Sequence, residues 1–430
     1  MKLVFPPKKT NTCYGLMVSG GADSTALLLW CAQNRETLGD FSVYTFDHRL
    51  RGEESRKEIR FVLSLCARLS VPCKEYLLPV NEYALATGLG VEESARALRY
   101  GVMQKEIEKG AITHAVTAHR LEDQAETVLF RLLRGTGLSG AAGMRGESDW
   151  LLRPMLGVTK AEVLAFLADH GQDYKEDSSN TDVRYTRNFL RTEIFPLLLE
   201  RFPSAQKNLA EFAALAQQDE DLLTRLSLPF LAENGEITPC AEYPLFSRAA
   251  IRALKALGIT KDYTKTHLDV LFALQSKRVG ATERLLYGVI AEKTRTGILL
   301  FHAPESFTPV PLAKGNFTFP FDICHVKKIR VGADFTPKKG CLYLDAAALP
   351  PSATLRAKEK GDAFIPFGHT TKKKVKDFFA DKKLNAKQKG ETLVLATDST
   401  VYAVLPYEIA DSVKLTEKTQ TAWEISFPKK

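Results

Sequence analysis

Four short apolar runs alternate with amphipathic segments over residues 13–134 of the chain. The apolar runs lie at 13–18, 41–46, 73–79 and 112–118, and the amphipathic segments lie near 24–34, 54–70, 91–109 and 121–134. This alternation predicts strands followed by helices. Such an order implies right-handed crossovers and a parallel sheet covered by helices on both faces. Ligands of these sheets bind at the carboxyl ends of the strands, so we expect a site among the residues that follow the apolar runs.

A glycine-rich loop at residues 19–24 (SGGADS) follows the first predicted strand and opens the first predicted helix. Paired glycines permit a tight turn, and a helix N-terminus carries partial positive charge, so the segment suits phosphate. Asp23 repels phosphate unless it holds Mg²⁺ against it. A turn capped by Ser24 would explain the two glycines alone. The whole loop lacks the Walker lysine and the GxGxxG spacing, and it resembles the pyrophosphatase loop of the N-type ATP pyrophosphatases.

Polar residues also follow the second and fourth apolar runs. Asp47 and His48 follow the second run, and His119 follows the fourth. Asp123 and Glu126 then lie three residues apart, on the helix face opposite an apolar stripe. We expect this face to border the strand-end cleft. Helix capping and a solvated outer face would also explain these carboxylates.

Two arginines in the third amphipathic segment share one helix face. Arg96 and Arg99 are three residues apart, as suits contacts with phosphate or nucleic acid. Ion pairs with Glu92 and Glu93, also at helical spacing, are the alternative explanation.

Five blocks of sequence resemble the tRNA(Ile)-lysidine synthetase family in content and order, almost continuously over residues 15–195. The blocks are HRLRGEES, EESARALRY, TAHRLEDQAETVLFRLLRGTGLSGAAGM, LLRPMLGVTKAEV and EDSSNTDVRYTRNFLR. The resemblance implies an ATP-dependent ligase that adenylates the wobble cytidine of a CAU-anticodon isoleucine tRNA. Free L-lysine then displaces AMP, which leaves lysidine. ATP, Mg²⁺, lysine and this tRNA are the implied cofactors and partners, and the family suggests a homodimer.

The resemblance also implies roles for individual residues. Those expected to bind ATP are Ser19, Gly20, Gly21, Ala22, Asp23, Ser24, Asp47, His48, Arg96 and His119. The two histidines have an equally good structural explanation. Asp23 and Asp123 are expected to hold Mg²⁺ and, with Glu126, to be catalytic. Lysine is expected to contact Glu126 and Arg187, with Arg184 and Arg191 as alternative partners of its carboxylate. The residues expected to contact tRNA are Arg99, Lys372, Lys373, Lys374 and Lys376.

The expected fold is α/β, with a parallel-sheet PP-loop ATP pyrophosphatase domain, a mainly helical middle domain and a small α+β C-terminal domain. The expected boundaries are 1–202 for the catalytic domain, 203–303 for the middle domain, 304–350 for a linker and the start of the C-terminal region, and 351–430 for a basic tRNA-binding domain.

The basic character of the C-terminal region is concentrated in one stretch. Residues 356–389 contain eleven basic and four acidic residues, nearly the whole formal net charge of +8. Such a stretch favours a polyanionic partner, although a solvated lysine-rich surface has the same composition. The segment GDAF resembles the family's GDRF, with Ala363 in place of the arginine. Lys387 and Lys389 stand where the family has arginines, and lysine keeps the charge but loses the bidentate fork.

Cysteine usage separates the competing functions. The seven cysteines include no CxxC pair, which disfavours a tRNA thiolase that uses the same adenylation step, the main alternative. An RNA-binding protein with a degenerate nucleotide domain is a third hypothesis, disfavoured by the intact SGGADS loop.

No apolar run reaches the roughly 18 to 20 residues of a membrane span, and MKLVFPPKK lacks the apolar stretch of a signal peptide. We therefore expect a cytoplasmic protein.

Overall fold

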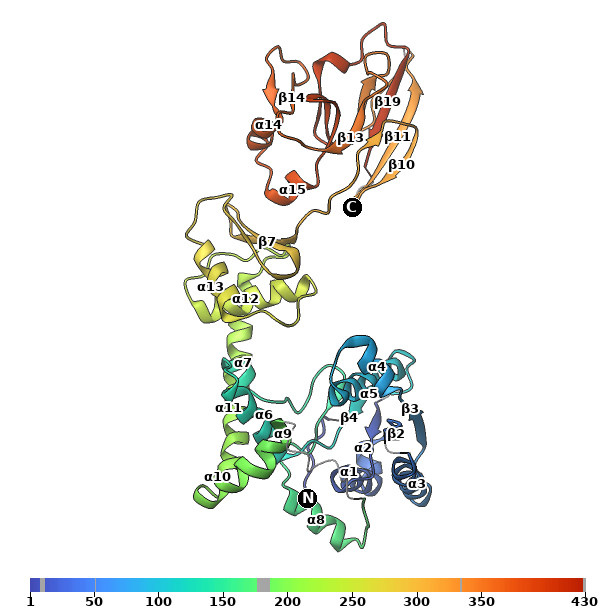
Figure 1. Ribbon diagram of the computed structural model, residues 1–430, viewed down its shortest axis with the longest axis vertical. Helices are drawn as coiled ribbons and strands as arrows, with labels where there is room; N and C mark the ends of the chain where they lie inside the picture. Colours follow the sequence, from blue (N-terminus) through green and yellow to red (C-terminus); the bar gives the residue numbers. More distant parts are fainter. Residues whose placement is uncertain (8–11, 51, 176–185, 333–334, 428–430) are drawn as a thin grey trace. The chain divides into compact units, whose positions relative to one another are not determined.

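The computed structural model describes residues 1–7, 12–50, 52–175, 186–332 and 335–427 (Figure 1). The chain forms two compact units, Met1–Leu222 and Leu223–Lys430. Among the described residues, no helix combines the length and apolar character that a bilayer crossing requires.

The N-terminal unit is built on a five-stranded sheet in the order β3-β2-β1-β4-β5. Its strands are β1 (Cys13–Met17), β2 (Asp40–Asp47), β3 (Cys73–Leu77), β4 (His114–Val116) and β5 (Leu151–Leu152). Every pairing is parallel, which confirms the predicted sheet. The sequence pattern missed β5, because a strand of two residues has no detectable periodicity.

Helices connect these strands and continue the chain beyond them (Figure 1). They are α1 (Ala22–Gln33), α2 (Arg35–Leu38), α3 (Glu53–Arg68), α4 (Val80–Thr87), α5 (Val91–Glu108), α6 (Leu121–Leu133), α7 (Leu138–Ala141), α8 (Lys160–Asp169), α9 (Thr186–Phe189), the π-helical segment η2 (Leu190–Ile194) and α10 (Phe195–Arg201). The four helices predicted from periodicity between residues 24 and 134 correspond to α1, α3, α5 and α6. The glycine-rich stretch after α6, predicted as a loop, contains the single turn α7.

The side chains of β1 alternate between the two faces of the sheet. Leu16 belongs to a core with residues of α1, α3 and α8, and Met17 belongs to a smaller core with Met103 of α5 on the other face. Gly15 points toward α5, where a Cβ would lie 2.6 Å from the Cδ1 atom of Ile112 and 2.7 Å from Cε of Met103. The absence of a side chain at Gly15 therefore lets α5 pack closely on the sheet.

The second unit begins with helices and a small antiparallel sheet. Long helix α11 (Ala205–Leu226) crosses the division between the units and leads into η3 (Leu228–Phe230), α12 (Tyr243–Ala256), α13 (Lys265–Leu274), β6 (Thr282–Arg284), η4 (Leu286–Gly288), β7 (Val289–Lys293) and β8 (Ile298–His302). Phe246, Leu271 and Val289 are fully buried in its core. The mainly helical character predicted for this part is confirmed, and the predicted strand pair near 283–302 is a three-stranded sheet.

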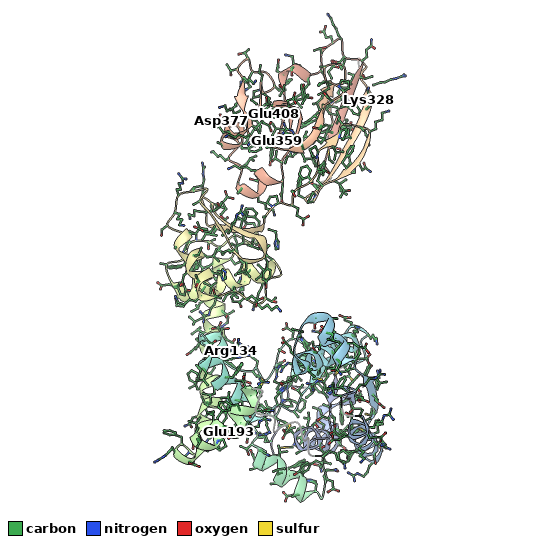
Figure 2. All side chains as sticks on the ribbon, viewed as in Figure 1. Arg134, Glu193, Lys328, Glu359, Asp377 and Glu408 are labelled. Carbon is green, nitrogen blue, oxygen red and sulfur yellow. The ribbon has the colours of Figure 1, made fainter. Side chains whose placement is uncertain are left out.

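The remainder of the second unit is mostly antiparallel β-structure with two short helices. Its elements are β9 (Val310–Pro311), β10 (Gly315–Thr318), β11 (Ile323–Arg330), β12 (Cys341–Asp345), β13 (Thr354–Ala357), β14 (Ala363–Phe364), β15 (Lys373–Lys374), α14 (Val375–Asp381), α15 (Ala386–Gly390), β16 (Leu393–Thr397), β17 (Thr400–Leu405), β18 (Glu408–Ile409), η5 (Asp411–Val413) and β19 (Thr421–Ser426). The strands form sheets in the orders β10-β11-β19-β12 and β15-β14-β17-β16-β13-β9. Figure 2 shows the side chains on this framework, with Lys328 and Glu359 among the exposed ones.

Residues 304–350, predicted as a linker and the start of the C-terminal region, contain four of these strands. Cys324 and Val326 of β11 are buried, and Leu344 of β12 is fully buried. Both strands pair with β19, close to the end of the chain. The prolines of this stretch lie mainly between short strands, and β11 and β12 pair with a strand far away in sequence. The predicted domain boundaries themselves stay predictions.

Candidate functional site

The SGGADS loop joins β1 to α1 in a closed turn. Gly20 has φ +91°, a conformation that favours glycine, and its carbonyl accepts hydrogen bonds from the Thr25 hydroxyl and the Lys175 N–H. Ser24 Oγ accepts a hydrogen bond from the Ser19 N–H at 3.2 Å and donates to the Gly21 carbonyl at 3.1 Å. These bonds fix the conformation of the loop at the N-terminus of α1, where the first backbone N–H groups are available to an anion.

Asp23, in the first turn of α1, is held by an arginine that the sequence analysis did not single out. Arg120 Nε donates to Asp23 Oδ2 at 3.0 Å, and Arg120 is 7% exposed. Its guanidinium also pairs with Glu122. Burial raises the pKa of Asp23, while the charge and hydrogen bond of Arg120 lower it. Arg120 therefore opposes the effect of burial on this half-buried carboxylate at the start of α1.

Asp123 has a structural and a cavity-facing role at once. Its Oδ2 accepts the backbone N–H of Arg120 at 3.0 Å, so it caps the N-terminus of α6. Its Oδ1 accepts a hydrogen bond from Arg191 Nη2 at 3.0 Å. The helix-capping explanation considered for this residue is thus correct, and it coexists with exposure to the cavity described below.

Glu126 lies one helical turn further and is almost completely buried, at 2% exposure. Arg191 grips it with two hydrogen bonds, Nε to Oε1 at 2.6 Å and Nη2 to Oε2 at 2.8 Å. Burial raises the pKa of Glu126, and the bonds from Arg191 lower it. Arg191 belongs to the π-helical segment η2, which lies alongside α6. Asp123 and Glu126 together therefore accept one guanidinium, that of Arg191, and of the two carboxylates only Asp123 lines the cavity described below.

One cavity of about 690 Å³, which we call the loop cavity, brings most of the predicted residues together. The predicted residues that line it are Ser19, Gly21, Ala22, Asp23, Ser24, His48, Arg96, Arg99, His119 and Asp123. Arg120, Lys160, Lys175 and Arg191 line it too. Two of these residues had only indirect signals in the sequence. Lys175 directly precedes the EDSSNTD stretch, and Arg120 directly follows His119.

Asp47 lies elsewhere. Its Oδ1 accepts the backbone N–H of Arg49 at 2.8 Å, and it lines a separate cavity of about 740 Å³ with Arg49 and Glu53. Asp47 therefore closes the turn after β2 with a largely buried side chain. Gly20 contributes the bend of the phosphate loop rather than the cavity lining.

His119 and Arg99 give the loop cavity a partly desolvated wall. Burial lowers the pKa of His119 to about 4, so its imidazole is neutral near pH 7; Nδ1 lies 2.7 Å from the Thr117 hydroxyl. The buried Nε of Arg99 has no hydrogen-bond partner among the described residues, and burial, together with the charge of Arg96, lowers the pKa of this guanidinium. Such a donor suits an anionic ligand.

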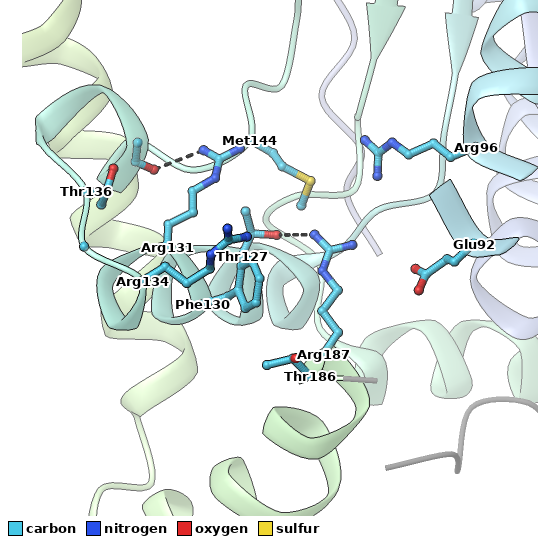
Figure 3. A pocket seen from close by; sticks show the side chains of 12 residues that line it. Glu92, Arg96, Thr127, Phe130, Arg131, Arg134, Thr136, Met144, Thr186 and Arg187 are labelled. Carbon is cyan, nitrogen blue, oxygen red and sulfur yellow. Dashed lines mark hydrogen bonds between the residues drawn. The ribbon is translucent and has the colours of Figure 1, made fainter. Parts of the chain in front are cut away.

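The three arginines considered for the lysine carboxylate lie in different places. Arg191 contacts Asp123 and Glu126, as described above. Arg187 donates to the Thr127 hydroxyl at 3.0 Å and lines a different cavity (Figure 3). Arg184 lies outside the described residues.

The predicted tRNA-binding lysines are on the surface of the C-terminal sheets. Lys372, Lys374 and Lys376 are exposed, whereas Lys373 is half-buried and pairs with Asp381. They surround β15, which pairs with β14 and leads into α14.

The donor set of the loop cavity is compatible with Mg²⁺. Asp23 and Asp123 both line the cavity, and carboxylates combined with phosphate oxygens and water are the usual ligands of Mg²⁺ in nucleotide sites. The described residues contain no group of three or more histidine, cysteine or acidic side chains arranged to hold a metal. The remaining ligands would therefore come from the nucleotide and from water.

Comparisons with known proteins agree on one relationship. A family model described as a PP-loop domain matches residues 2–198. A curated tRNA(Ile)-lysidine synthase from Parabacteroides distasonis is 31% identical over 425 residues, which cover 95% of this chain and 94% of the relative. One from Bacteroides thetaiotaomicron is 29% identical over 418 residues, 94% of this chain and 92% of the relative. A solved U34-tRNA thiolase from Methanococcus maripaludis is 13% identical with a TM-score of 0.41, and the match covers 49% of this chain and 74% of the thiolase.

Proposed function

The chain belongs to the tRNA(Ile)-lysidine synthase family, and we propose that it joins free L-lysine to C2 of the wobble cytidine in a CAU-anticodon isoleucine tRNA. ATP is consumed to AMP and pyrophosphate in two steps. The C2 carbonyl oxygen of the cytidine first attacks the α-phosphorus of ATP, which releases pyrophosphate. The ε-amine of lysine then attacks C2 and displaces AMP.

The observation that carries this proposal is the content of the loop cavity. One cavity combines a glycine-rich phosphate loop at a helix N-terminus with Asp123, whose carboxylate and that of its neighbour Glu126 accept the same cationic side chain. An enzyme that must activate with ATP and then receive a cationic amine needs these two features side by side.

In the first step the cavity offers positive charge where pyrophosphate leaves. We assign the backbone N–H groups at the start of α1 and the guanidinium of Arg96 to the phosphates of ATP. Arg99, which lines the same cavity, stays a predicted tRNA contact. Asp23 and Asp123 would hold Mg²⁺, which would neutralise charge on the departing pyrophosphate. Arg120 positions Asp23 and counteracts the rise of its pKa that burial causes.

In the second step the carboxylates act on lysine. In the structure, the guanidinium of Arg191 donates hydrogen bonds to Asp123 and Glu126. We assign this place to an amino group of the lysine substrate, because an ammonium group would donate to the same two carboxylates. On binding, the ammonium would take over these bonds, and the displaced guanidinium would meet the lysine carboxylate bidentately. The raised pKa of Glu126, caused by burial, suits a group that accepts a proton from the attacking amine. Arg187 stays a predicted partner of the lysine carboxylate, although its contact with Thr127 favours Arg191.

The thiolase alternative requires a sulfur-carrying group beside the activated base. No cysteine is among the described residues that line the loop cavity. The two relatives described above each cover more than nine-tenths of the chain and are named lysidine synthases. Both observations favour lysine over sulfur as the second substrate.

The proposal predicts an intermediate that can be isolated. With α-labelled ATP and a CAU-anticodon transcript, label should accumulate on the RNA when lysine is omitted and should leave as AMP when lysine is added. AMP formation at the same rate with and without lysine, or label that never reaches RNA, would contradict the proposal.

A cytoplasmic location and assembly as a homodimer are further predictions, tested by fractionation and by light scattering.

A further inference from the structure

A second cavity of about 760 Å³ lies along the second half of α6 and the glycine-rich segment that follows this helix. We call it the arginine cavity, and the residues of its lining that matter here are Arg96, Phe130, Arg134, Thr136, Met144 and Arg187 (Figure 3). Figure 3 shows Arg96 entering from α5, Phe130 and Arg134 from α6, and Arg187 from α9. Its volume lies within the range of about 300 to 1,000 Å³ that is typical of sites for small ligands.

The arginines of this cavity differ from those of the carboxylate pair. Arg120 and Arg191 are both paired with acidic side chains. Among the described residues of the lining, Glu92 is the only acidic side chain against four arginines, and it forms an ion pair with none of them. Cations in such excess repel one another and favour an anionic ligand. The positive charge of these arginines also affects Arg131, which lines the same cavity. Burial lowers the pKa of Arg131, and the charges of Arg187 and Arg96 lower it further.

The cavity also offers a planar surface. The guanidinium carbon of Arg134 lies 5.2 Å from the centroid of the Phe130 ring. Phenylalanine rings and guanidinium planes are the surfaces on which proteins stack unpaired RNA bases. Thr136 adds a hydroxyl at the rim, and Met144 adds a polarisable apolar wall.

The wall that carries Met144 is fixed before any ligand binds. The side-chain amide of Gln124 pairs with the backbone of Met144, accepting its N–H at 2.7 Å and donating to its carbonyl at 2.9 Å. Arg131 Nη1 donates to the carbonyls of Gly140 and Gly143 at 3.0 and 2.9 Å. Arg131 thus ties the glycine-rich loop to α6, and a preformed wall lowers the entropic cost of binding.

The arginine cavity adjoins the reacting groups through shared residues. Arg96 lines both the loop cavity and the arginine cavity. Thr127, which holds Arg187, directly follows Glu126, which holds Arg191. A nucleotide in the arginine cavity would therefore lie next to a cytidine in the loop cavity.

We propose that the arginine cavity binds a single-stranded nucleotide adjacent to the reacting cytidine, with its base stacked on the Arg134–Phe130 pair and its phosphate at Arg187, while Arg96, which lines both cavities, contacts ATP. This inference rests on the proposed function and adds the place where RNA approaches the reaction centre. A free nucleotide such as a second ATP would satisfy the same chemistry, so the test separates the two.

The test compares Michaelis constants in a lysine-incorporation assay. Arg134→Ala should raise the KM for the tRNA about tenfold and leave the KM values for ATP and lysine within twofold, because only the RNA reaches this cavity. Phe130→Leu keeps an apolar side chain in the core and should also raise the KM for the tRNA, while Arg134→Lys should recover part of the loss. Arg35→Ala is the matched control, because Arg35 also lies 5.2 Å from a phenylalanine ring, that of Phe41, outside both cavities. It should behave as wild type.

A crosslink gives an independent readout. A transcript with 4-thiouridine beside the target cytidine should crosslink to the segment 130–144 in the wild type. Unchanged KM values for the tRNA in both Arg134→Ala and Phe130→Leu, or a raised KM for ATP instead, would overturn the inference. A wild-type enzyme that incorporates no lysine would contradict the proposed function instead, so the two failures are distinguishable.

Discussion

Arg120 Nε lies 3.0 Å from Asp23 Oδ2, although the two residues are 97 positions apart in the chain. The bond ties the start of α6 to the start of α1, where the two carboxylates proposed to hold Mg²⁺ line one cavity. Since Arg120 is 7% exposed, its charge acts on Asp23 with little screening by solvent. Arg120 is thus a positioning residue for the first step.

Replacing Arg120 should change the pH dependence of adenylation. Burial already raises the pKa of Asp23, and Arg120 counteracts that effect. In Arg120→Met the pKa of Asp23 should rise further, so pyrophosphate release should fall off at a higher pH than in the wild type as the solution is acidified. The measurement is a pH profile of tRNA-dependent pyrophosphate release. Arg60→Met, which removes an exposed guanidinium, is the control, and an acid limb identical to that of the wild type in Arg120→Met would contradict the assignment.

Glu126→Gln should separate the two chemical steps. The neutral amide binds an ammonium more weakly, and loss of a hydrogen bond to a charged group costs roughly 1.5–3 kcal/mol, or about 10- to 100-fold in affinity. The KM for lysine should rise by this factor, while adenylated RNA should still form without lysine. Glu193→Gln, an exposed glutamate of the same π-helical segment (Figure 2), should leave both steps unchanged. Equal losses of adenylation and of lysine transfer in Glu126→Gln would show that Glu126 does not act on lysine alone.

The lysines around β15 should contribute to the salt dependence of tRNA binding. Replacing Lys372, Lys373 and Lys374 by alanine should weaken binding and reduce the slope of log K against log salt by roughly one to two units. We expect the slope to change by less than three phosphate contacts would give, because Lys373 is already paired with Asp381. Filter binding at several salt concentrations measures the slope. Replacing Lys255, Lys261 and Arg278 removes the same charge from another exposed surface, and equal slopes for the two triple variants would exclude a specific contact.

The GDAF segment should be important for the stability of the C-terminal sheets. Asp362 accepts two hydrogen bonds from Arg356, at 2.8 and 2.9 Å, and both residues are buried. Asp362→Ala would leave the guanidinium buried without its partner, which costs about 3–5 kcal/mol. Amide hydrogen exchange in β13 and β16 should accelerate accordingly. Lys414→Ala, which breaks an exposed pair with Asp411, should cost less than about 1 kcal/mol. Unchanged exchange in Asp362→Ala would mean that the sheets do not depend on this pair.

The parallel sheet and its first helices were predictable because their signals are local. Each apolar run of β1 to β4 is long enough to show a pattern, and the periodicity of α3 and α6 follows the buried face. The strands β9 to β12 were missed for the opposite reason. β9 pairs with β13, and β11 and β12 pair with β19, so these pairings depend on residues far along the chain. β10 pairs with the next strand, β11, but lies in a proline-rich stretch in which a short strand shows no pattern.

The candidate site was predictable in its outline but not in its pairing. Since strand ends meet at one edge of a parallel sheet, residues 19–24, His119 and Asp123 were expected to converge, and all of them except Gly20 line one cavity. The partners of the carboxylates were not predictable, because Arg120 and Arg191 reach them across large sequence separations. Asp47 shows a limit of the same reasoning, since it follows β2 as expected but accepts a hydrogen bond within its own turn and lines a separate cavity.

The most direct test of the account is incorporation of radiolabelled lysine into a CAU-anticodon isoleucine tRNA transcript, with and without ATP, by the wild type and by Asp123→Ala. The account predicts ATP-dependent labelling by the wild type and its loss in the variant, which removes one of the two carboxylates proposed to hold Mg²⁺. Absence of labelling by the folded wild type, while the addition of tRNA still releases AMP, would mean that activation occurs but lysine is not the nucleophile, which contradicts the central claim.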